Sequence, residues 1–163
     1  MITENKGVVT GILIAATLWF FMFSPWTAPM INFWGAMTFS AVILTCVSRW
    51  LCPEMFKELR FGGKQIVLGF AIAFVLWWVF WIGDKMSQLI FNFARPQVDM
   101  IYSMGNGTSS VIIAILLLLI IGPAEEIFWR GFVQRRLMLR FGSNIGFIAA
   151  TVCYALVHIW SFN

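Results

Sequence analysis

The sequence has few charged residues, one histidine and three cysteines. Of its 163 residues, 61% are hydrophobic and 11% are charged, whereas an ordinary soluble domain has roughly 45–50% apolar and about 25% charged residues. This composition excludes a soluble globular protein, a disordered chain, a collagen-like repeat and a coiled coil. The odd, small number of cysteines excludes a secreted disulfide framework.

The longest stretch without a charge extends from Gly7 to Ser48. As one helix it would be roughly 60 Å long, twice the ~30 Å hydrocarbon core of a bilayer. The stretch must therefore cross a membrane and return. Pro25 and Pro29 cannot continue a helix, so they mark the turn of this hairpin.

Further apolar stretches follow along the chain, and together they predict an all-α, polytopic transmembrane helix bundle. We expect a single membrane domain over residues 1–163 with about five membrane helices. Their predicted ranges are 8–23, 31–51, 65–82, 110–140 and 144–162.

The net charge of +4 and the pI near 9.3 fit the positive-inside rule better than nucleic-acid binding. We therefore expect membrane lipid, and no nucleic acid, as a partner. With a cytoplasmic N-terminus, the outer connections hold only Lys85 and Arg95. The inner segments then hold Lys6, Arg49, Lys57, Arg60, Lys64, Arg130, Arg135, Arg136 and Arg140.

Two of the seven acidic residues, Glu125 and Glu126, are adjacent and directly follow an apolar run. An ionisable group at the bilayer centre costs at least ~2.5–3.5 kcal/mol and usually faces a cavity or a partner. Glu126 and Arg130 are four residues apart, in the favourable order for a helical ion pair. Glu125 is rotated by about 100° from Glu126, so it stays available as a base.

The only histidine, His158, lies in the last apolar stretch. Gly142 marks a turn over residues 141–144, with Glu125 17 residues before it and His158 16 residues after it. An antiparallel helical hairpin would bring both to the same depth. There, Glu125 would take a proton from water while His158 orients that water or stabilises an oxyanion. Gly122-Pro123 would kink the helix and open space.

Structural roles remain alternatives for these residues. The two glutamates would then be interfacial residues paired with nearby arginines, and His158 would be a buried histidine with a satisfied hydrogen bond. The remaining arginines after Arg130 are predicted to meet anionic lipid.

The segment Glu125-Glu126-Ile127-Phe128-Trp129-Arg130 resembles the first motif, Glu-Glu-x-x-x-Arg, of the CPBP (CAAX protease and bacteriocin-processing, or Abi) family of intramembrane endopeptidases. Tyr154-Ala155-Leu156-Val157-His158 is similar to its second motif, with tyrosine where phenylalanine is usual. The resemblance implies hydrolysis of a peptide or a prenylated protein substrate. By position, Glu125 would activate water, Glu126 and Arg130 would brace the site, and His158 would position water or the oxyanion.

The family is often labelled as metalloprotease, which implies a divalent metal such as zinc with Glu125 and His158 as ligands. A catalytic zinc normally has three protein ligands, so this sequence favours water activated by glutamate without an evident cofactor. The family's third motif, a later histidine followed by an asparagine, is absent. Asn163 lies in the same element as His158 and does not serve as the asparagine of the third motif. We therefore expect a C-terminally truncated member.

We therefore predict an integral protein of a prokaryotic plasma membrane with endopeptidase activity. Two other functions stay open. One is a non-catalytic membrane immunity or scaffold protein of the same fold. The other is a proton or ion relay, because intramembrane carboxylates and histidines also serve transport.

Overall fold

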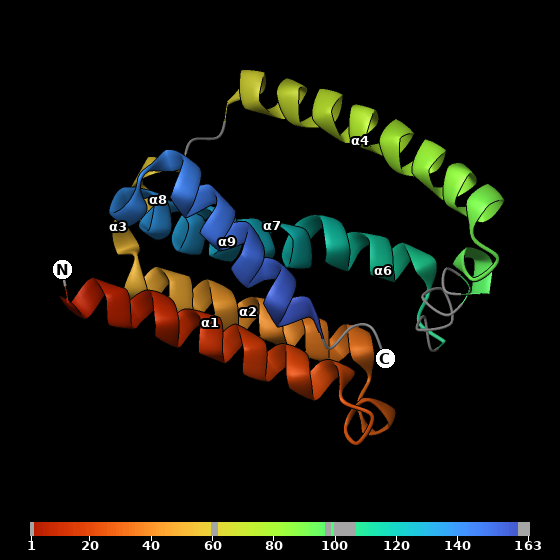
Figure 1. The fold of residues 1–163 in the computed structure, drawn as a ribbon, viewed down its shortest axis with the longest axis horizontal. Coiled ribbons are helices and arrows are strands. Elements are labelled where there is room, and N and C mark those ends of the chain that lie inside the picture. The colour runs from red at the N-terminus through yellow and green to blue at the C-terminus, as the bar shows by residue number, and fades with distance from the viewer. Residues whose placement is uncertain (1, 60–61, 97–98, 100–106, 160–163) are drawn as a thin grey trace. The chain divides into compact units, whose positions relative to one another are not determined.

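The computed structural model describes residues 2–59, 62–96, 99 and 107–159, with side chains described from Gly7 onward. All regular secondary structure within these ranges is helical, as Figure 1 shows. The predicted all-α class is thereby confirmed.

The chain forms two compact units, one of residues 1–57 and 107–163 and the other of residues 58–106. The second unit contains α4 (Gly63–Ile90). The first unit contains the remaining elements: α1 (Ile2–Phe23), the 3₁₀ turn η1 (Ala28–Met30), α2 (Phe33–Leu51), α3 (Pro53–Glu58, whose last residue belongs to the second unit), α6 (Ser110–Leu116), η2 (Leu117–Ile121), α7 (Gly122–Glu125), η3 (Glu126–Gln134), α8 (Arg135–Phe141) and α9 (Ser143–Val157).

Among the described residues, three helices are long and apolar enough to cross a membrane: α2, α4 and the continuous helix Ser110–Phe141. Two shorter apolar helices, Gly7–Phe23 and Ser143–Val157, accompany them. These helices mark an integral membrane protein. The division into a single membrane domain stays a prediction.

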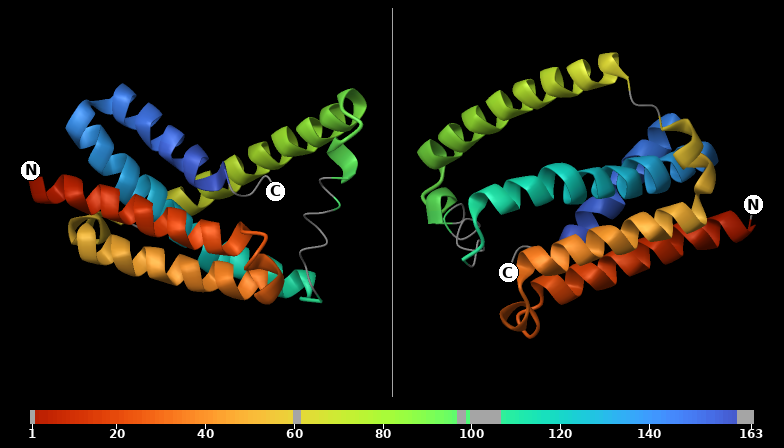
Figure 2. Two further views of the ribbon diagram at one scale, coloured as in Figure 1. Left: turned by 60° about the horizontal axis from the view of Figure 1, so that its bottom comes forward. Right: turned by 180° about the vertical axis from the view of Figure 1, so that it is seen from behind.

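α1 and α2 form the predicted hairpin and lie side by side in Figures 1 and 2. α1 ends at Phe23, where the proline-containing segment begins, and the Thr27 hydroxyl donates to the Phe21 carbonyl. α2 begins at Phe33 instead of residue 31 because the Asn32 side chain caps it, accepting from the Gly35 N–H at 2.8 Å.

α4 extends to Ile90, eight residues beyond its predicted end at residue 82. The sequence predicts an outer connection after Ile82, but the polar residues there continue the helix with bonds of their own. Gln88 Nε2 donates to Asp84 Oδ1 at 2.7 Å, and Ser87 Oγ donates to the Asp84 carbonyl at 2.9 Å.

The long helix continues through Gly122-Pro123, where the sequence predicted a kink. Gly122 keeps helical dihedrals, φ −58° and ψ −54°, and its N–H donates to the Leu117 carbonyl five residues back. Such a bond defines a π-turn, and η2 and η3 are both π-helical. π-helical turns widen a helix locally and occur frequently at functional sites.

The core of the first unit joins α1, α2 and η3. Its largest fully buried side chains include Trp19 from α1, Leu44 from α2, and Phe128 and Phe132 from η3. Without a hydrophobic force between helices in lipid, this close packing supplies the association. It holds η3 in place from two sides.

α3 contacts η3 and the start of α8. Arg136 Nη2 lies 2.5 Å from Glu54 Oε1 and donates to the Leu51 carbonyl at 3.3 Å. The pKa of Glu54 is lowered from 4.5, mainly by a hydrogen bond from its own backbone N–H, with contributions from Cys52 and Arg136. Burial, followed by the hydrogen bond to Glu54, raises the pKa of the Cys52 thiol.

A close approach between Gly131 and Met55 completes this junction. A Cβ atom at Gly131 would overlap Met55 Sδ, and Met55 itself is buried. Only glycine lets α3 sit this near to η3.

We predict that Gly131→Ala lowers the free energy of unfolding by about 1–3 kcal/mol, the usual cost of overpacking. Gly69→Ala is the matched control, because no described residue lies within 4 Å of its added Cβ and alanine favours a helix. Thermal unfolding in detergent measures both variants. A Gly131→Ala protein as stable as Gly69→Ala would contradict the packing described here.

Candidate active site

The site residues come from the long helix and α9, which run antiparallel after one tight turn (Figure 1). Gly142 forms that turn with φ +83°, a conformation that favours glycine. Its N–H donates to the Met138 carbonyl at 3.0 Å, and its carbonyl accepts from the Gly146 N–H at 2.9 Å. The turn lies where the sequence predicted it.

Aromatic contacts set the register of the two helices. The Trp129 ring lies edge-on to Tyr154 with centroids 5.2 Å apart, and its centroid is 6.2 Å from that of His158. Because the helices are antiparallel, Glu125, one turn before Trp129, lies at the level of His158, one turn after Tyr154.

Glu126 and Arg130 form the ion pair that their spacing predicts. Arg130 Nη1 lies 3.0 Å from Glu126 Oε1. Both side chains are more than half exposed, at 54% for Arg130 and 62% for Glu126. The Arg130 guanidinium also stands 5.8 Å from the centroid of the Tyr154 ring, so this arginine connects the long helix with α9.

Glu125 has a different environment from Glu126. Glu125 is partly buried. Within the described part of the chain, its carboxylate forms no hydrogen bond or ion pair. Arg130, Glu126 and Tyr154 lie near enough to interact with it electrostatically. The two adjacent glutamates are thus separated into one paired and one unpaired carboxylate.

His158 is half-buried and held by aromatic rings from three elements. Its ring centroid lies 4.1 Å from that of Tyr154 and 5.0 Å from that of Trp19. Its Nδ1 lies 2.7 Å from the Tyr154 carbonyl oxygen. A carbonyl only accepts, so Nδ1 carries a proton; when the ring is neutral, Nε2 therefore holds the lone pair.

This assignment separates the two roles expected of His158. Neutral His158 accepts a hydrogen bond at Nε2, which suits the orientation of a water molecule. Donation to an oxyanion from that nitrogen would require the doubly protonated ring.

Two tryptophans belong to this cluster although the sequence analysis gave them no role. Trp19 is 1% exposed and reaches His158 from α1; one of nine tryptophans in an aromatic-rich chain carries no signal of such a contact. Trp129 is 3% exposed, and its indole N–H has no hydrogen-bond partner among the described residues. Its place inside the Glu-Glu-x-x-x-Arg segment was the available signal.

A cavity of about 250 Å³ adjoins the cluster between the long helix and α9. Trp129, Arg130 and Tyr154 line it, together with Gln134 and Thr151. It offers an indole, a guanidinium, an amide and two hydroxyl-bearing side chains to a ligand.

The described residues do not form a zinc site of the usual kind. Within residues 7–59, 62–96, 99 and 107–159, no three histidine, cysteine, aspartate or glutamate side chains cluster closely enough to hold a metal ion. Glu125 and His158 supply two donors, one fewer than a catalytic zinc takes from protein. Asn163 lies outside the described residues.

The C-terminal third of the chain resembles a known protein family. Residues 107–163 match the family described as Type II CAAX prenyl endopeptidase Rce1-like, and this segment contains both motifs. The match confirms, over this part of the chain, the resemblance to the CPBP family. No curated protein and no solved structure matches the chain.

We predict that nitrogen NMR of the protein labelled with ¹⁵N-histidine shows Nδ1 as the protonated nitrogen at neutral pH. The chain has a single histidine, so the spectrum reports His158 alone. His158→Asn, whose amide can still donate to the Tyr154 carbonyl, should remove the signal without unfolding the protein. Protonation at Nε2 in the neutral ring would contradict the hydrogen bond to Tyr154.

Proposed function

We propose that this chain is an intramembrane endopeptidase of the CAAX prenyl protease type, hydrolysing peptide bonds with water activated by Glu125. The observation that supports it most is the division of the glutamate pair. Arg130 engages Glu126, while Glu125, at the level of His158, forms no ion pair with any described residue. A carboxylate with that freedom in a partly buried site suits a general base.

The reaction proceeds in two steps. Glu125 accepts a proton from water while the water oxygen bonds to the scissile carbonyl carbon, and the carbonyl oxygen takes the electron pair. The tetrahedral intermediate then collapses, the carbon–nitrogen bond breaks, and protonated Glu125 returns its proton to the leaving amine.

The other residues position the reactants. His158 accepts a hydrogen bond from the attacking water at Nε2, and Trp19 and Tyr154 fix the plane of its ring. Glu126 and Arg130 brace the helix that carries Glu125. A peptide or a prenylated protein would enter through the cavity beside Trp129 and Arg130.

We further propose a prokaryotic plasma membrane with the N-terminus in the cytoplasm. The basic residues support this orientation, since it leaves only Lys85 and Arg95 outside. Membrane lipid is then a constant partner of the chain.

We predict that Glu125→Gln lowers the rate of peptide cleavage by about 10²–10⁴-fold, the contribution of a general base. The assay is hydrolysis of a quenched fluorescent peptide by the protein in liposomes. Glu126→Gln is the matched control and should lose less activity, because it removes an exposed brace and leaves the base in place.

A thermal stability equal to that of the unmodified protein shows that each variant keeps the fold. Full activity of Glu125→Gln would refute the proposed mechanism. Proton uptake into liposomes without peptide cleavage would refute the protease function itself and favour a relay.

A further inference from the structure

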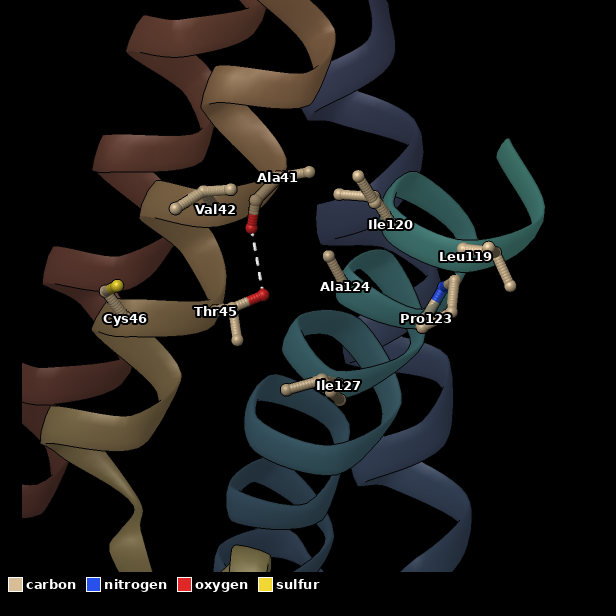
Figure 3. A pocket seen from close by; sticks show the side chains of 9 residues that line it. All are labelled: Ala41, Val42, Thr45, Cys46, Leu119, Ile120, Pro123, Ala124 and Ile127. Carbon is tan, nitrogen blue, oxygen red and sulfur yellow. Dashed lines mark hydrogen bonds between the residues drawn. The ribbon is translucent and has the colours of Figure 1, made fainter. Parts of the chain in front are cut away.

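Two adjoining cavities lie along α2, and neither shares a lining residue with the cavity beside Trp129; together they are called the groove. One cavity of about 300 Å³ lies between α2 and the long helix, as Figure 3 shows, and one of about 520 Å³ lies at the end of α2 against α3. Thr45 and Cys46 line both cavities. Residues four apart share a helix face, so Ala41, Thr45 and Arg49 mark one track along α2.

The part of the groove beside the long helix is apolar. Small side chains, Ala41 on α2 and Ala124 on α7, leave the space open (Figure 3). The Thr45 hydroxyl donates to the Ala41 carbonyl at 2.9 Å, so its proton is used within the helix. The Thr45 hydroxyl is therefore not available to donate a hydrogen bond to a ligand in this part of the groove.

The other end of the groove carries a positive charge. Arg49 is exposed and lies with its guanidinium 5.6 Å from the Phe56 ring centroid. It forms no ion pair within the part of the chain that the structure describes. Trp50 beside it is 77% exposed, as an aromatic anchor at a membrane interface would be.

We propose that this groove binds an anionic phospholipid, with an acyl chain between α2 and the long helix and the phosphate on Arg49. The distance along α2 from Ala41 to Arg49 is about 12 Å at 1.5 Å per residue, close to one leaflet of the ~30 Å hydrocarbon core. The groove therefore places apolar space and charge at the depths where one lipid has its chain and its headgroup. The net negative charge of such a lipid complements Arg49. Phosphatidylcholine has no net charge and does not offer this attraction.

Native mass spectrometry of the delipidated protein, titrated with phosphatidylglycerol or phosphatidylcholine, tests the headgroup. We expect one phosphatidylglycerol to bind about fivefold more tightly than phosphatidylcholine, the contribution of one arginine near anionic lipid. Arg49→Gln should abolish that preference. Arg140→Gln is the matched control, because Arg140 also lies over a phenylalanine ring, at 4.7 Å, but lines neither of these cavities.

A second pair of variants tests the acyl chain. Cys46 is exposed, so Cys46→Trp fills the groove without crowding the core, and Cys46→Ser leaves it open. Cys46→Trp should weaken the binding of both lipids, and Cys46→Ser should weaken the binding of neither. Equal binding of the two lipids, equal losses in Arg49→Gln and Arg140→Gln, or unchanged binding in Cys46→Trp would each overturn the proposal. None of these measurements depends on peptide cleavage.

Discussion

The contact of Trp129 with Tyr154 and His158 is the constraint on which the candidate site depends. It fixes the register of the long helix against α9. That register determines which residues of the two helices lie opposite one another in the site. Slipping α9 by one residue would rotate His158 by about 100° away from the long helix. A ring packed from three elements resists such a slip, because each contact would be lost together with the others.

The surrounding helices support that register from outside the site. α1 contributes Trp19, which contacts His158, and α3 contributes Glu54 and Met55, which hold the π-helical segment through Arg136 and Gly131. A π-helical segment is rare and is retained only where its surroundings favour it. The bundle therefore acts as a scaffold for one irregular stretch that carries Glu126, Trp129 and Arg130.

The sequence was sufficient to predict the features that depend on local chemistry. Proline ended α1, Gly142 placed the last turn, and the spacing of Glu126 and Arg130 predicted their ion pair. Features that depend on tertiary packing were missed. The contact of Trp19 with His158 joins residues far apart in sequence, and the π-turns at Gly122 depend on backbone bonds that composition does not encode. One local feature was missed as well: α4 extends beyond residue 82, where Gln88 donates to Asp84 within the same helix.

The central claim is that Glu125 and His158 act on the same water molecule. A double-mutant cycle of peptide hydrolysis with Glu125→Gln, His158→Asn and the double variant measures this directly. Groups that act as a unit are strongly non-additive, so we expect the double variant to be about as slow as Glu125→Gln alone. Losses that multiply would mean that the two residues act independently and would contradict the account.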